Sequence, residues 1–129
     1  MDCPECGTEM VAFAVPAVAR DAAPGDVAAI CPACLTLVEA DAAESDPDFS
    51  RIIEAFPGGE SGAVMAVAVG LLVESMVLNR ESIFRLFDVV SDRGGDPWLV
   101  LERLDASPTV QPDADVGRAK RQLEQLLDR

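Results

Sequence analysis

The stretch "CPECG", residues 3–7, has a partial second copy later in the chain, "CPAC", residues 31–34. Together the two copies hold all four cysteines of the 129-residue chain, and in each copy a proline follows the first cysteine. The fixed φ of proline stiffens such a turn. Gly7 follows the first pair, where a left-handed backbone suits glycine, and Leu35 takes that place after the second pair. Two turns of this kind can direct four sulfurs at one point.

Paired cysteines serve three chemistries: disulfides, redox dithiols and metal sites. Disulfides belong mostly to exported chains, and the first residues show no basic and apolar leader. A redox pair usually opens a helix, whereas strands and turns are expected around both pairs here. Four thiolates from two such turns form the ligand set of structural Zn²⁺. The pattern therefore favours zinc over the two alternatives, with four ligands: Cys3, Cys6, Cys31 and Cys34.

Residues 1–44 have the pattern of a zinc ribbon, in which short antiparallel strands surround the ion. Three apolar runs predict strands: 10–19, 27–30 and 35–40. Pro24-Gly25 marks the turn between the first two runs, and Pro16 predicts an edge strand or a bulge. A segment this short cannot build a sufficient core, so the ion is expected to replace one.

From residue 45 to residue 129 the pattern becomes helical. It predicts a small all-α domain of four to five helices after the ribbon, and an α+β fold overall. The expected helices cover 47–56, 60–78, 80–92, 97–104 and 113–128. Asp46-Pro47 and Asp96-Pro97 are start signals, because aspartate caps a helix and proline suits its first position. The run 62–73 is apolar on all sides, which predicts a central helix, and Gly70 suggests that another backbone comes close.

Composition excludes several classes of function. The 23 acidic and 10 basic residues give a formal net charge of −13, which counts against contact with a nucleic-acid backbone. Histidine and tyrosine are absent, which excludes Ser-His-Asp, Cys-His and HExxH sites and favours a non-enzymatic protein. The run 62–73 is shorter than the roughly 20 residues of a membrane span. A cytoplasmic protein without a membrane segment is therefore expected, and the 62–73 helix could carry a homo-oligomer.

The whole chain resembles a family of small, uncharacterised haloarchaeal proteins with an N-terminal zinc ribbon. Besides the cysteines, the resemblance lies in "EAFPGG" (54–59), "AVGLLVES" (68–75), "DPWLVLERL" (96–104) and "RQLEQLLDR" (121–129). The acidic composition, with Lys120 as its one lysine, is similar to that of proteins from salt-accumulating cells. There a dense carboxylate surface maintains solubility. The family implies the fold and assigns no activity.

A site of four thiolates is closed to substrate, so its zinc is expected to be structural. The leading hypothesis is therefore an adaptor or regulator whose partner is another protein. The only basic cluster, Arg118, Lys120 and Arg121, is a candidate contact, and its plain alternative is a solvated helix face. A nucleic-acid-binding ribbon and a thiol-based redox or metal sensor are the other hypotheses. Arg20 is the only basic side chain of the ribbon, which disfavours nucleic acid.

Overall fold

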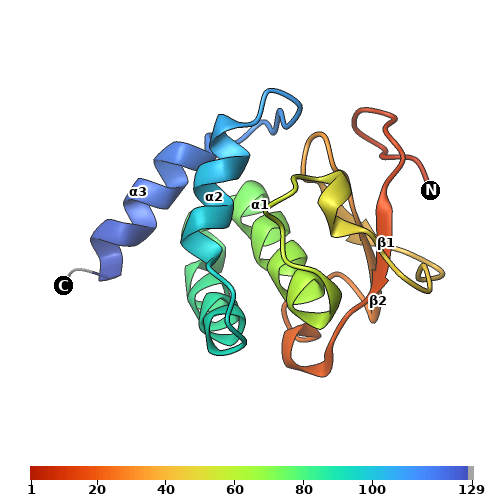
Figure 1. Cartoon of the computed structure of the whole chain (residues 1–129), viewed down its shortest axis with the longest axis horizontal. Coiled ribbons are helices and arrows are strands. Elements are labelled where there is room, and N and C mark those ends of the chain that lie inside the picture. Colours follow the sequence, from red (N-terminus) through yellow and green to blue (C-terminus); the bar gives the residue numbers. More distant parts are fainter. Residues whose placement is uncertain (128–129) are drawn as a thin grey trace.

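The computed structural model describes residues 1–127, which form a small antiparallel sheet followed by three helices (Figure 1). The strands β1 (Val11–Ala14), β2 (Val27–Ile30) and β3 (Leu37–Glu39) lie in that order in the sheet. The helices are α1 (Gly59–Asp92), α2 (Pro97–Ala106) and α3 (Val116–Leu127), and two 3-10 turns are η1 (Ala17–Ala19) and η2 (Phe49–Arg51). The strands lie at one end of the molecule and α3 at the other, with α1 between them (Figure 1).

Side chains of the sheet alternate between two buried clusters. Phe13 and Ile30 belong to the main core with the helices, whereas Ala12 and Ala29 belong to a smaller cluster on the opposite face. Ala12 pairs with Ala29 across the antiparallel strands, so paired residues share a face. Cys31 directly follows β2 and continues the alternation of Ala29. The pleat therefore turns Cys31 into the smaller cluster, away from the main core.

The first half of α1 runs through the middle of the fold. Its residues 62–72 are buried, and α1 contacts α2, α3, β3 and η1, as the all-round apolar pattern predicts. By length and composition the helix could cross a membrane, with a hydropathy of 2.0, but 61% of its most apolar window is buried inside the fold. The main core contains side chains from both 1–44 and 45–129.

Gly70 lies where β3 meets α1, and the close neighbour there is the side chain of Leu37 rather than the backbone that was expected. A Cβ at Gly70 would lie 2.5 Å from the Cβ of Leu37. Gly70→Ala is expected to lower the free energy of unfolding by about 1–2 kcal/mol in denaturant titration, because overpacking outweighs the helix propensity gained. Gly58→Ala is the control, since nothing lies within 4 Å of a Cβ there. Equal stability of the Gly70 variant and wild type would contradict this close approach.

A kink at Ser75 divides α1 into two segments. The φ of −167° and ψ of 102° at Ser75 are not helical. Its Oγ accepts the N–H of Leu78 at 3.3 Å, and Asn79 Nδ2 donates to the C=O of Leu71 at 3.1 Å. These side chains satisfy backbone groups that the kink leaves without helical partners. The two helices predicted over 60–78 and 80–92 are therefore one kinked helix, and the break comes earlier than predicted.

The helix predicted over 47–56 is wrong, and so is the expected total of four to five helices. Within residues 1–127 the structure has three helices, and this segment forms only η2. Asp48 accepts the backbone N–H of Ser50 at 3.0 Å, a local bond that competes with helical pairing. Phe49 and Phe56 are buried as the pattern requires, but an irregular chain places them in the core.

The start signals of α2 and α3 come from aspartates. Asp96 accepts the N–H of Leu99 at 3.1 Å, with Pro97 in the first position, as predicted. Asp115 accepts the N–H of Arg118 at 3.0 Å, and α3 begins after it, three residues later than the predicted start at 113. The acidic side chain nearest the helix therefore sets the start of α3.

Candidate metal centre

The two CxxC turns share one backbone conformation over residues 3–8 (first turn) and 31–36 (second turn). In each, the residue after the second cysteine donates its N–H to the C=O of the first cysteine. The first cysteine donates its own N–H to the C=O of the threonine that ends the turn. The bonds are Gly7 N to Cys3 O and Leu35 N to Cys31 O, both 2.9 Å, Cys3 N to Thr8 O, 2.8 Å, and Cys31 N to Thr36 O, 2.9 Å. The sequence repeat is therefore also a structural repeat.

Both turns place a left-handed residue after the second cysteine. Gly7 has φ +80° and Leu35 has φ +64°. A side chain in this region costs roughly 1–2 kcal/mol. Leu35 is fully buried in the main core, and that burial offsets the strain. Leu35 therefore anchors the second turn in the core, whereas Gly7 leaves the first turn at the surface.

The four cysteine sulfurs converge between the turns. All four Sγ atoms lie within 4.8 Å of one another. The Sγ atoms of Cys3 and Cys34 are 3.6 Å apart, and those of Cys6 and Cys31 are 3.4 Å apart. A tetrahedral site with metal–sulfur bonds of about 2.3 Å has sulfur–sulfur edges of about 3.8 Å. The cysteines are therefore near enough to bind one metal ion.

The four thiols differ in exposure. Cys3 and Cys31 are buried, Cys34 is half-buried and Cys6 is exposed. Hydrogen bonds with Thr8 lower the pKa of the Cys6 thiol to about 6. Burial raises the pKa of Cys31 to about 12 and raises the pKa of Cys34 above its usual value. A metal binds thiolates, so binding would release protons and strengthen as pH rises.

Both turns are tied to the rest of the chain by backbone carbonyls. Ala33 in the second turn accepts the N–H of Gln111, from the loop between α2 and α3, at 2.7 Å. Glu9, which follows the first turn, accepts a hydrogen bond from Arg51 at 3.0 Å. The segments that carry the cysteines are therefore hydrogen-bonded to residues far away in the sequence.

The predicted basic cluster separates on α3. Arg118 and Arg121 are exposed, whereas Lys120 is half-buried and pairs with Glu124 at 3.1 Å. Residues four apart share a helix face. Arg118 therefore lies on the face of residue 122 and Arg121 on the face of residue 125, and Lys120 points elsewhere.

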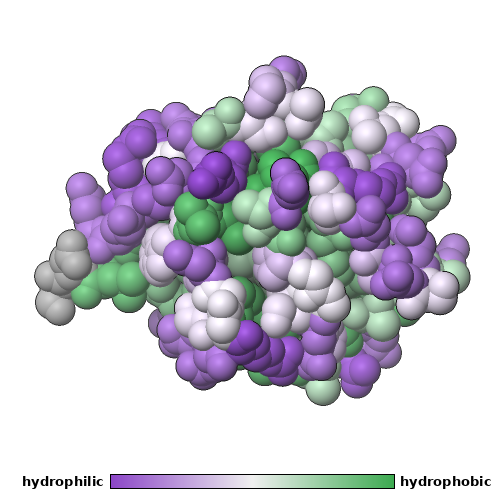
Figure 2. Space-filling view, in the orientation of Figure 1, coloured by the Kyte–Doolittle hydropathy of each residue, from purple (hydrophilic) through white to green (hydrophobic). Residues whose placement is uncertain are grey.

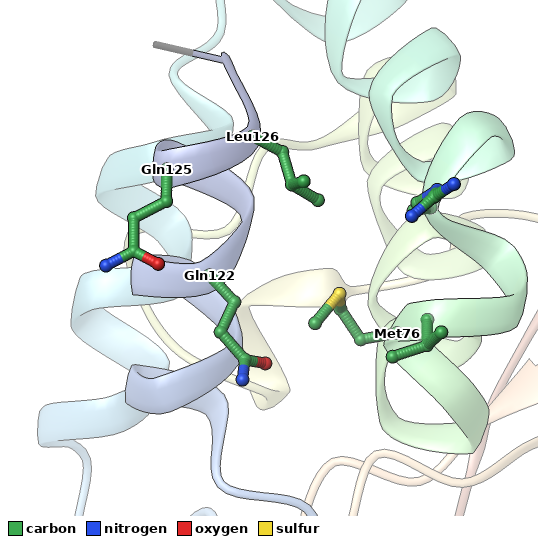
Figure 3. Close-up of a pocket in the computed structure, with 6 residues that line it drawn as sticks. Met76, Gln122, Gln125 and Leu126 are labelled. Atoms are coloured by element: carbon green, nitrogen blue, oxygen red, sulfur yellow. The ribbon is translucent and has the colours of Figure 1, made fainter. Parts of the chain in front are cut away.

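That face of α3 borders a pocket of about 280 Å³ between α3 and the second segment of α1 (Figure 3). The pocket is called here the kink groove, and its lining is Met76, Val77, Arg80, Gln122, Gln125 and Leu126. Leu126 and Met76 lie on facing sides of it (Figure 3). Helical periodicity alone does not predict the groove, because the groove depends on the kink in α1. The sequence signal for that kink was Ser75, three residues before Leu78.

Exposed hydrophobic side chains lie on the two helices that form this groove, and one of them, Val77, lines it. Val77 and Leu78 are 65% and 86% exposed, and Leu127 is 55% exposed. On the face shown in Figure 2, hydrophobic residues lie beside the C-terminal end of α3 among hydrophilic ones. These are three of the five exposed large hydrophobic residues among residues 1–127, and all three lie on α1 or α3.

One protein-family model, described as a family of unknown function, matches residues 2–127. The matched span includes the four cysteines, the sheet and all three helices. No curated protein and no solved structure matches the chain.

Proposed function

Because the chain belongs to DUF6276, a family of unknown function, we propose its role from its own residues. The protein is a small cytoplasmic protein-interaction adaptor or regulator, non-enzymatic and stabilised by one structural Zn²⁺. The ion is held by Cys3, Cys6, Cys31 and Cys34, and the partner binds at the kink groove. The observation that carries the proposal is the exposure of Val77, which lines this groove, and of Leu78, which follows it in the chain.

The donor set supports zinc. Four thiolates satisfy a tetrahedral Zn²⁺ completely and leave no position for water or substrate, which is the structural type of site. The ion would join two turns that lie 28 residues apart, counted from Cys3 to Cys31. Free thiols persist in a reducing compartment, which supports a cytoplasmic location.

Charge around the groove supports an acidic partner. Arg80 lines the groove, and Arg118 and Arg121 extend from its α3 side. Among residues 1–127 these three arginines form no ion pair within 4.0 Å, although the chain is strongly acidic. Exposed apolar side chains beside arginines that form no ion pair among residues 1–127 fit a protein segment with apolar anchors and flanking carboxylates.

The test uses affinity capture from native lysate with the partner identified and then purified. A Val77→Ser and Leu78→Ser double variant is expected to lose the partner that wild type retains, with binding of the purified partner weakened at least about tenfold. Leu99→Ser is the matched control, because Leu99 is an exposed apolar residue on α2, 39% exposed. Equal binding of the partner by all three proteins would refute the groove as its site.

Light scattering distinguishes a foreign partner from a second copy of the chain. The 62–73 helix is the segment expected to carry a homo-oligomer, but its residues 62–72 are buried within one chain, so the exposed Val77–Leu78 surface is the better candidate. A dimer that the double variant abolishes would make a second copy the occupant of the groove. A monomer that binds an acidic protein would support the adaptor role.

The exposure of Cys6 favours one second candidate, a thiol-based sensor. Its Sγ lies 3.4 Å from that of Cys31. Hydrogen peroxide could take two electrons from these two thiolates, giving a disulfide and two hydroxide ions and releasing zinc. Release of zinc at micromolar peroxide, with a Cys6–Cys31 disulfide found by mass spectrometry, would support the sensor. Retention of zinc would exclude the sensor and leave the adaptor as the proposed function.

A further inference from the structure

Two threonines occupy the same place in the two turns, two residues after the second cysteine. Thr8 Oγ1 lies 3.3 Å from Cys6 Sγ, and Thr36 Oγ1 lies 3.1 Å from Cys34 Sγ. The backbone N–H groups of Thr8 and Thr36 also act on these two sulfurs, whereas the other two sulfurs have amide partners without a hydroxyl. Cys3 Sγ accepts the N–H of Glu5, and Cys31 Sγ accepts the N–H of Cys34, both at 3.4 Å. Each sulfur therefore has at least one N–H or O–H group beside it.

The charge of the centre makes these groups important. Four thiolates around one Zn²⁺ carry a net charge of −2, and they lie in an acidic segment. The only basic side chain of residues 1–44 is Arg20, which donates to the C=O of Val15 rather than to a sulfur. The positive ends of N–H and O–H dipoles are then the local groups that stabilise the negative charge.

Metal binding fixes the direction of the threonine hydrogen bonds. In the free thiol, the S–H of Cys6 can donate to Thr8 Oγ1. A metal-bound thiolate has no proton to donate, so the hydroxyl must become the donor. Packing does not explain the hydroxyls, because Thr8 is exposed and Thr36 is only half-buried.

We infer that Thr8 and Thr36 are positioning residues of the metal centre, whose hydroxyls donate to the Cys6 and Cys34 thiolates. At each of these sulfurs the hydroxyl adds a second donor to the backbone N–H group of the same threonine. The inference rests on the zinc assignment proposed above. Water competes more strongly for the exposed Cys6 than for the half-buried Cys34, so Thr36 contributes more than Thr8.

The experiment compares Thr8→Val, Thr36→Val and the double variant with wild type. Valine keeps the branched shape and removes the hydroxyl. Competition between each protein and a chelator for Zn²⁺ is expected to show affinity about tenfold lower for Thr36→Val, less reduced for Thr8→Val and lowest in the double variant. With Co²⁺ as probe, the sulfur-to-metal charge-transfer band should move to lower energy. Thr36→Ser should restore both properties, and Ser91→Ala, which removes an exposed hydroxyl at the end of α1, is the control.

The possible results separate the assignment of zinc to the four cysteines from the role inferred for the two threonines. Failure of the wild-type chain to bind Zn²⁺ or Co²⁺ would overturn the zinc assignment and this inference with it. Wild-type binding with all valine variants within twofold, and with unchanged Co²⁺ spectra, would overturn the inference alone. An equal loss in Ser91→Ala would also overturn it, because the effect would then not come from hydroxyls at the sulfurs.

Discussion

Cys31→Ser is expected to abolish stoichiometric zinc binding and to unfold the sheet. Cys31 is fully buried and directly follows β2, so its loss removes one of the four proposed metal ligands at the edge of the sheet. Apparent binding energies of structural zinc are about 10–16 kcal/mol, comparable with the entire stability of a domain, about 5–15 kcal/mol. Metal analysis should give well below one zinc per chain, and amide exchange in β1 and β2 should lose its protection.

Ala33→Ser is the matched control for this substitution. Ala33 lies in the same turn between the two cysteines and is half-buried, and the change adds the same hydroxyl without removing a ligand. One zinc per chain and protected strands are expected for it. A Cys31→Ser protein with one tightly bound zinc and wild-type protection would show that the fourth thiolate is not needed.

Phe49→Ala is expected to lower the free energy of unfolding by about 3–5 kcal/mol. Phe49 is 1% exposed, with its ring centroid 5.4 Å from that of Phe13 in β1 and 5.9 Å from that of Phe56. A Cβ added at Gly62 of α1 would lie 2.5 Å from the same ring, so the ring fills the space between sheet and helix. Its removal leaves a cavity where the two parts of the fold meet.

Denaturant titration of the zinc-loaded protein measures this loss. Phe84→Ala is the control, because Phe84 is a half-buried phenylalanine of α1 and should cost less. If both substitutions shifted the midpoint equally, Phe49 would not be the link between strands and helices. A loss confined to Phe49→Ala, with one zinc retained per chain, would show that the core and the metal centre contribute separately.

The metal centre was the part of the structure most accessible from sequence. Cys3, Cys6, Cys31 and Cys34 define it because CxxC spacing constrains local geometry, and the structure confirms their convergence. The central helix followed from its all-round apolar pattern, since such a stretch has no polar face to expose.

Other features depended on competition between local and tertiary effects. The pattern of Phe49 and Phe56 specified burial but not the backbone that provides it, and η2 formed where a helix was predicted. The kink at Ser75 comes with a serine cap inside the segment 60–78, which the apolar periodicity predicts as one uninterrupted helix. The kink groove follows from the kink together with the packing of α3, a contact between segments that periodicity does not relate.

The hydrogen bond from Gln111 to Ala33 has a consequence for how the two ends of the molecule respond to each other. It joins the second turn to the loop that leads into α3, and α3 forms one wall of the kink groove. If metal occupancy restricts the motion of this loop, it also restricts the wall. Binding equilibria that share such an element are reciprocal. A partner that binds the zinc-loaded protein more tightly than the zinc-free protein must then raise the affinity of this protein for zinc by the same factor.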